Sequence, residues 1–195
     1  MKINEVKYNW NGALTKRRET KYIILHHRAG NGDVEGIHKT HLANGWSGIG
    51  YHFYVRINGE VYCGRPIDTV GAHCTGYNSG SLGVCFEGNY QADTTMPDAQ
   101  LKAGLELIEF LKGKYPSAEI KKHSDFMATA CPGKYFPFDE MEDGRMDKLV
   151  SANDITWELS QKIQIDDVDG FVEALEKAKE EDSPLYWGLY KVVNK

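Results

Sequence analysis

Two segments that lie far apart in this chain carry residue types that bind the same kind of metal ion. His26 follows the apolar run at residues 22–25, and His123 and Cys131 form a His-x7-Cys spacing. Two imidazoles and one thiolate make a His2Cys set, which leaves the fourth tetrahedral position of Zn²⁺ open for water. An open position distinguishes a catalytic zinc site from a structural one. A fold that uses this set must bring the two segments together.

The composition is that of a globular protein. The 195 residues are 41% hydrophobic and 26% charged, which suits one domain with a small appendage. After position 150 there are 10 acidic and 5 basic residues, so the tail carries the whole net charge of −5. Such a tail disfavours binding to nucleic acid or to an anionic membrane. No apolar run reaches the roughly 18 residues of a membrane span.

The four cysteines do not indicate a disulfide scaffold in a chain of this length. Three of them match no zinc-ribbon spacing, and we interpret them as buried free thiols: Cys63, Cys74 and Cys85. The first seven residues lack the apolar stretch of a signal peptide. We therefore expect a protein that is made and first kept in the cytoplasm.

Strand and helix signals alternate along the first 140 residues or so. Strands are predicted at residues 21–27, 51–57, 60–63, 82–86 and around 120. Asn58-Gly59 joins the second and third, which is a strong hairpin signal. Helices are predicted after a cap at residues 31–33 and over residues 95–114. The interleaving predicts an α/β fold with a mixed central β-sheet flanked by helices.

The C-terminal region reads as a small helical and aromatic appendage. The polar residues 141–151 suggest a linker, which gives domains at 1–145 and 152–195. One helix face is formed by Phe171, Ala174, Leu175 and Ala178. Two interpretations stay open: a module that binds the cell wall or a partner, or an extension packed on the body. The aromatic side chains concerned are Trp157, Tyr186, Trp187 and Tyr190.

Further motifs stand between the candidate ligands in a fixed order. They are Gly-Tyr-His-Phe at residues 50–53 and Gly-Ala-His at 71–73, which runs into Tyr-Asn-Ser at 77–79; Cys-Pro-Gly follows at 131–133. With these, residues 20–138 resemble the zinc-dependent N-acetylmuramoyl-L-alanine amidases shared by phage endolysins and peptidoglycan recognition proteins. The resemblance implies that His26, His123 and Cys131 hold Zn²⁺.

The resemblance also implies Tyr51 as a catalytic residue near the metal, with Thr129 two residues before the last ligand. Zn²⁺ polarises the amide carbonyl and lowers the pKa of its bound water to roughly 7. We expect the two hydroxyls to hydrogen-bond the oxyanion or the attacking water, and loss of such a donor costs on the order of 10²–10³ in rate. Some members carry a catalytic Glu where this chain has Cys85, so a general base is not assigned at that position.

A Gly- and Asn-rich loop offers candidates for substrate binding, because binding residues concentrate on loops. We expect His73, Tyr77 and Asn78 to line the groove for the stem peptide. Arg65 has two interpretations, a partner for a substrate carboxylate or a solvated loop residue. The other histidines are interpreted as structural: His27, His38, His41 and His52.

These inferences predict a peptidoglycan hydrolase that cleaves the amide bond between the N-acetylmuramic acid lactyl group and L-Ala. Its partner is peptidoglycan or a muropeptide. We expect a phage or prophage endolysin that stays cytoplasmic until it is released to the wall. A cytoplasmic wall-recycling amidase fits a missing signal peptide equally well. A non-catalytic muropeptide-binding module is the third alternative, which the presence of Cys131 disfavours.

Overall fold

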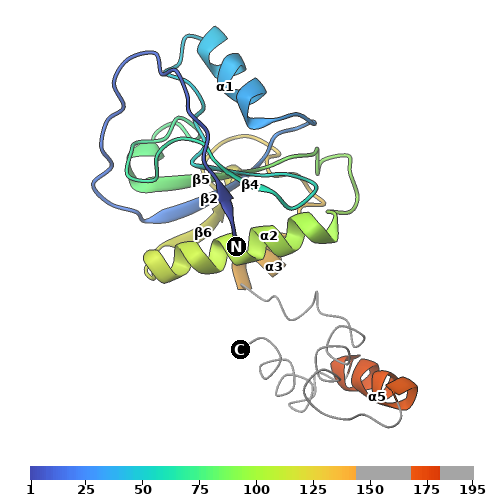
Figure 1. The fold of residues 1–195 in the computed structure, drawn as a ribbon. Coiled ribbons are helices and arrows are strands. Elements are labelled where there is room, and N and C mark those ends of the chain that lie inside the picture. Colours follow the sequence, from blue (N-terminus) through green and yellow to red (C-terminus); the bar gives the residue numbers. More distant parts are fainter. Residues whose placement is uncertain (144–167, 181–195) are drawn as a thin grey trace. The chain divides into compact units, whose positions relative to one another are not determined.

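The computed structural model describes residues 1–143 and 168–180. The chain divides into a unit of residues 1–144 and a unit of residues 145–195, which are described separately. The first unit is built around one six-stranded sheet (Figure 1). Its strands are β1 (Ile3–Asn4), β2 (Tyr22–His27), β3 (Phe53–Val55), β4 (Val61–Cys63), β5 (Ser81–Phe86) and β6 (Glu119–Lys122).

The sheet is mixed, as the sequence predicts. The strand order is β1-β4-β3-β5-β2-β6. Only β3 and β4 are antiparallel neighbours among these strands, and they form the hairpin around Asn58-Gly59. Strand β2 lies between β5 and β6 and is fully buried at residues 23–25. A central strand whose two faces are both covered by helices reads as a continuous apolar run.

Helices cover both faces of the sheet (Figure 1). They are α1 (Val34–Ala43), α2 (Asp98–Lys114) and the short α3 (Phe138–Asp143). Helix α1 packs its apolar stripe on Tyr54 and Cys85. On α2, a Cβ added at Gly104 would lie 2.6 Å from the Phe86 ring. Cys85 and Phe86 are consecutive on β5 and point to opposite faces, so the two helices sandwich the sheet.

Two boundaries differ from the sequence-based expectation. Helix α2 begins at Asp98 because Pro97 occupies its N-cap position rather than its first turn. The expected linker at 141–151 starts too early, since Met141 lies in α3 and is 0% exposed. Its side chain packs beside Gly104 of α2. The sequence does not indicate this contact, because the residues around Met141 are mostly charged.

In the second unit, the described residues form one helix, α5 (Val168–Glu180). This confirms the helix expected there, and its Leu175 is buried. The four aromatic residues of the expected binding surface lie outside the described residues, so the role of the appendage stays a prediction. Within residues 1–143 and 168–180, no helix combines the length and apolarity that a membrane crossing requires.

Candidate metal centre and active site

The parallel pairing of β2 and β6 places the two histidines side by side. Leu25 is in register with Lys122, the last residue of β6. The next residue in each segment is a histidine: His26, still in β2, and His123, which begins a 3-10 turn directly after β6. Their ring centroids lie 4.5 Å apart. The carboxyl ends of parallel strands meet at one sheet edge, and this edge carries two imidazoles.

The loop after β6 brings the thiol to the same place. Ser124 N–H donates to the Cys131 carbonyl at 2.9 Å, which closes the loop onto its own start. Gly133 has φ +107, and a Cβ there would lie 2.3 Å from the Tyr90 backbone. Gly133 therefore allows a close backbone approach to Tyr90 that a side chain would block. The Cys131 Sγ ends 3.8 Å from His26 Nδ1.

The three side chains form one donor cluster, with ligand atoms of His26, His123 and Cys131 all within 4.8 Å of one another. Burial lowers the pKa of both histidines, so the rings are neutral and able to bind a metal. Burial raises the pKa of the Cys131 thiol to about 11, which disfavours a bare thiolate at neutral pH. A bound cation would reverse that preference. Imidazole and thiolate donors in this number fit a zinc site with an open position.

Both expected catalytic hydroxyls stand beside this donor cluster. The Tyr51 ring centroid lies 5.1 Å from that of His26. Desolvation raises the pKa of Tyr51 well above its ordinary value, so the phenol stays protonated and able to donate. Thr129 Oγ1 accepts the Cys131 N–H at 3.2 Å, and the residue is exposed. Its own hydroxyl hydrogen remains free to donate to a substrate oxygen.

The three residues expected to bind substrate differ in exposure: Tyr77 faces the surface, whereas His73 and the Asn78 side-chain oxygen face the interior. Tyr77 is 36% exposed and stacks on Phe126, with ring centroids 4.0 Å apart. Asn78 turns its Oδ1 inward, where it accepts the backbone N–H groups of His73 and Cys74. The His73 ring is buried, with Nδ1 3.0 Å from His26 Nε2. Substrate contact by His73, Tyr77 and Asn78 stays a prediction.

Comparison with known proteins gives a family match and similar endolysins. The family described as N-acetylmuramoyl-L-alanine amidase matches residues 16–134. The chain belongs to this amidase family. The endolysin of Enterobacteria phage K11 is 38% identical over 126 residues, which cover 60% of this chain and 83% of the endolysin. These matches identify a peptidoglycan hydrolase of the N-acetylmuramoyl-L-alanine amidase type.

Solved structures resemble the amidase in fold. The N-acetylmuramoyl-L-alanine amidase LysC from Clostridium intestinale has a TM-score of 0.70 and 38% identity, covering 73% of this chain and 96% of LysC. A complex of the peptidoglycan recognition protein ectodomains LCa and LCx with tracheal cytotoxin has a TM-score of 0.66 and 28% identity. The match covers 72% of this chain and 95% of the matched chain in that complex. The mixed sheet with flanking helices is the fold of these neighbours.

The other histidines of the amidase bind backbone groups. His38 Nδ1 and His41 Nδ1 accept the N–H groups of Ile49 and Gly50. His52 Nδ1 accepts from Gly83 N, and His27 Nδ1 accepts from Tyr90 N. The structural interpretation of these four rings agrees with these contacts. Cys74 and Cys85 are buried free thiols, as expected, whereas Cys63 is partly exposed.

Arg65 is not a solvated loop residue. Its guanidinium is buried and donates to the carbonyl groups of Gly48, Ile49 and Val70. It also lies over the Trp10 ring, 5.6 Å from the centroid. Arg65 therefore joins residues 48–49, Val70 and Trp10 inside the protein, and its contact with a substrate carboxylate stays a prediction.

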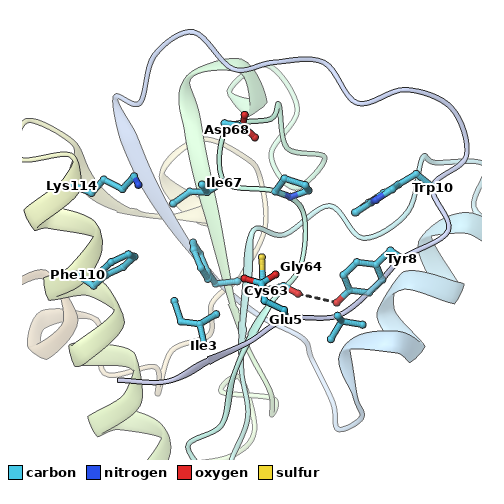
Figure 2. Close-up of a pocket in the computed structure, with 13 residues that line it drawn as sticks. Ile3, Glu5, Tyr8, Trp10, Cys63, Gly64, Ile67, Asp68, Phe110 and Lys114 are labelled. Atoms are coloured by element: carbon cyan, nitrogen blue, oxygen red, sulfur yellow. Dashed lines mark hydrogen bonds between the residues drawn. The ribbon is translucent and has the colours of Figure 1, made fainter.

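A separate cavity of about 380 Å³ lies between the N-terminal segment, β4 and α2 (Figure 2). Apolar side chains such as Ile3 and Phe110 line it, and Tyr8 donates to the Cys63 carbonyl at its wall. No residue of the donor cluster lines this cavity. This cavity and the donor cluster thus occupy different places, and the donor chemistry, not the cavity, marks the candidate active site.

Proposed function

We propose that this amidase is a zinc-dependent phage-type endolysin. Its substrate would be the amide bond between the lactyl group of N-acetylmuramic acid and L-Ala in peptidoglycan. The observation that carries the proposal is the convergence of His26, His123 and Cys131 at one sheet edge. The endolysin identity of the phage K11 relative supports lysis as the biological role.

In the proposed site, His26, His123 and Cys131 would hold Zn²⁺. When bound, the ion supplies Lewis acidity that polarises the scissile carbonyl and activates a water for attack. The side chains of this chain account for the rest of the chemistry. The two neutral imidazoles and the thiol, which is partly buried, offer a set of three ligands, and such a set keeps one position for water or substrate.

Attack on the amide carbon develops negative charge on its oxygen, which needs hydrogen-bond donors. Tyr51 fits because burial keeps its phenol protonated and its ring lies against His26. Thr129 fits because its oxygen is held by the Cys131 N–H while its hydrogen is free. We assign both residues to oxyanion stabilisation or to orientation of the attacking water. Cys85 stands in register with His26, at the position where the resemblance implies a carboxylate in some members. Burial raises the pKa of the Cys85 thiol, which therefore stays protonated at neutral pH, and we do not assign it as the general base.

An aromatic surface made by Tyr77 and Phe126 offers the substrate a contact area. These two rings stack, and Tyr22 lies beside both of them. Aromatic faces bind apolar surface while a phenol keeps a polar tip for hydrogen bonding. The complex of a related fold with tracheal cytotoxin supports a muropeptide as the ligand class. We propose that Tyr77 contacts the glycan or the stem peptide.

The test compares whole walls with soluble fragments. Chelation should abolish hydrolysis of purified walls, and added Zn²⁺ should restore it. The products should carry new L-Ala amino groups detected by mass spectrometry, without new reducing sugar ends.

An endolysin should cleave polymeric walls at least as well as soluble muropeptides, whereas a recycling enzyme should prefer the fragments. Full activity in verified metal-free protein would contradict the zinc mechanism.

A further inference from the structure

His26 has two ring nitrogens that face different partners. Its Nδ1 lies 3.8 Å from Cys131 Sγ, and its Nε2 lies 3.0 Å from His73 Nδ1. A neutral imidazole carries hydrogen on one nitrogen, so the partner at Nε2 decides whether Nδ1 keeps the lone pair that a metal needs. We propose that His73 is a positioning residue that holds His26 in the Nε2–H tautomer. This inference rests on the zinc site of the proposed function.

The direction of the hydrogen bonds follows from the far end of the network. The Tyr77 carbonyl can only accept, and Ser81 Oγ lies 2.8 Å from it. The Ser81 hydroxyl hydrogen therefore points to that carbonyl, and its lone pairs face His73 Nε2 at 3.4 Å. In a neutral ring, His73 then carries its hydrogen on Nε2 and accepts at Nδ1. The donor that completes the chain is the Nε2–H of His26.

The His73 ring is held in one orientation by its surroundings. It sits between two glycines: a Cβ at Gly83 would lie 2.5 Å from its Cγ, and one at Gly71 would lie 2.5 Å from its Cδ2. Asn78 Oδ1 fixes the backbone, because it accepts the His73 N–H at 2.8 Å. Ring flips that would exchange the nitrogen and carbon positions are blocked by this packing. The acceptor at Nδ1 therefore stays aimed at His26.

The contact between the two rings is also closed to solvent. His26 is 1% exposed and His73 is 9% exposed. Water is therefore a poor substitute partner for His26 Nε2 once His73 is changed. Partners of this kind fix the tautomer of a metal-binding histidine, and their loss typically lowers metal affinity by about 10–100-fold.

The experiment uses a matched pair of variants. In His73→Asn the side-chain amide replaces Nδ1, so its oxygen still accepts from His26. In His73→Gln the amide reaches the position of Nε2 and leaves His26 without that acceptor. Competition with a chromophoric zinc chelator should give His73→Asn an affinity close to wild type and His73→Gln an affinity about 10–100-fold weaker. His38→Asn, away from the donor cluster, should leave the zinc affinity unchanged.

A second readout follows the tautomer directly. Long-range ¹H–¹⁵N NMR of metal-free wild type should show His26 with hydrogen on Nε2, and His73→Gln should shift it towards a mixture. Equal zinc affinity of the two His73 variants, or an Nδ1–H tautomer in wild type, would overturn the inference. Failure of wild type to bind zinc would instead refute the proposed function, and the NMR measurement would still decide the tautomer.

Discussion

Histidines serve different purposes at α1 and at the end of β2. His38 on α1 uses both ring nitrogens on backbone groups, Ile49 N and Asn9 O. His26 on β2 uses one nitrogen on His73 and turns the other towards Cys131 and His123. Both rings are buried, so burial does not separate a ligand from a structural residue. A ring nitrogen that faces other metal donors does.

The largest expected effect tests the donor cluster itself. Cys131→Ser replaces the thiolate with a hydroxyl, a much weaker zinc ligand, and should bring wall hydrolysis below detection. Its zinc content should fall with it, while the fold measured by circular dichroism stays. Cys63→Ser, at the wall of the separate cavity, is the control and should keep wild-type turnover. Equal activity of the two variants would contradict a role for Cys131 in the donor cluster.

The next effect concerns the hydroxyl beside the donor cluster. Tyr51→Phe keeps the ring against His26 and removes only the donor. We expect kcat to fall on the order of 10²–10³ with zinc affinity unchanged, because the lost bond acts mainly on developing charge. Steady-state kinetics on wall fragments and metal titration would measure the two quantities. A fall in zinc affinity with no fall in kcat of zinc-saturated enzyme would assign Tyr51 to the metal site instead.

A smaller effect is expected from the structural histidines. His38→Ala leaves the buried Ile49 N–H without its acceptor and removes packing against Tyr8 and Trp10. The free energy of unfolding should fall by about 1–3 kcal/mol, measured by urea denaturation. Zinc affinity and turnover of the folded protein should match wild type. A loss of zinc binding without a loss of stability would contradict the purely structural role of His38.

The last prediction is a pH dependence of stability that leaves the donor cluster intact. Burial lowers the pKa of His52 to about 3, against an ordinary value of about 6.5. Between these values the unfolded chain binds a proton that the folded protein does not, so stability falls as pH drops from 6.5. The contribution reaches about 1.4 kcal/mol per pH unit and is fully restored above pH 6.5. Urea unfolding of metal-free protein at pH 7 and pH 5 should show a shallower dependence for His52→Gln than for wild type.

The donor cluster was predictable because its chemistry is visible in residue types and their order. Each residue alone was weak evidence, and the ordered motifs shared with the amidase family singled out two histidines at strand ends and a cysteine on the following loop. The surroundings of His73 were not predictable, because they depend on Gly71, Gly83 and Ser81 meeting in space. Arg65 shows the same limit: an arginine in a polar loop reads as exposed until distant carbonyl groups and Trp10 enclose it.

The predicted fold was right where the pattern is local and wrong where contacts are distant. The hairpin at Asn58-Gly59 and the central strand ending at His26 follow from short-range signals. The two-residue strand β1 has too little sequence to give a periodic signal. Helix α3 is short and acidic, and it is recognisable only from the burial of Met141 against α2.

The order of strands in the sheet has a consequence for how the enzyme is made. Strand β2 carries the first donor, yet both of its neighbours, β5 and β6, are synthesised later. A nascent polypeptide therefore holds β2 without either neighbour until β5 is made, and with one edge unpaired until β6 has left the ribosome. Premature termination anywhere before position 131 yields a chain lacking Cys131, so the proposed donor set is complete only near the end of this unit.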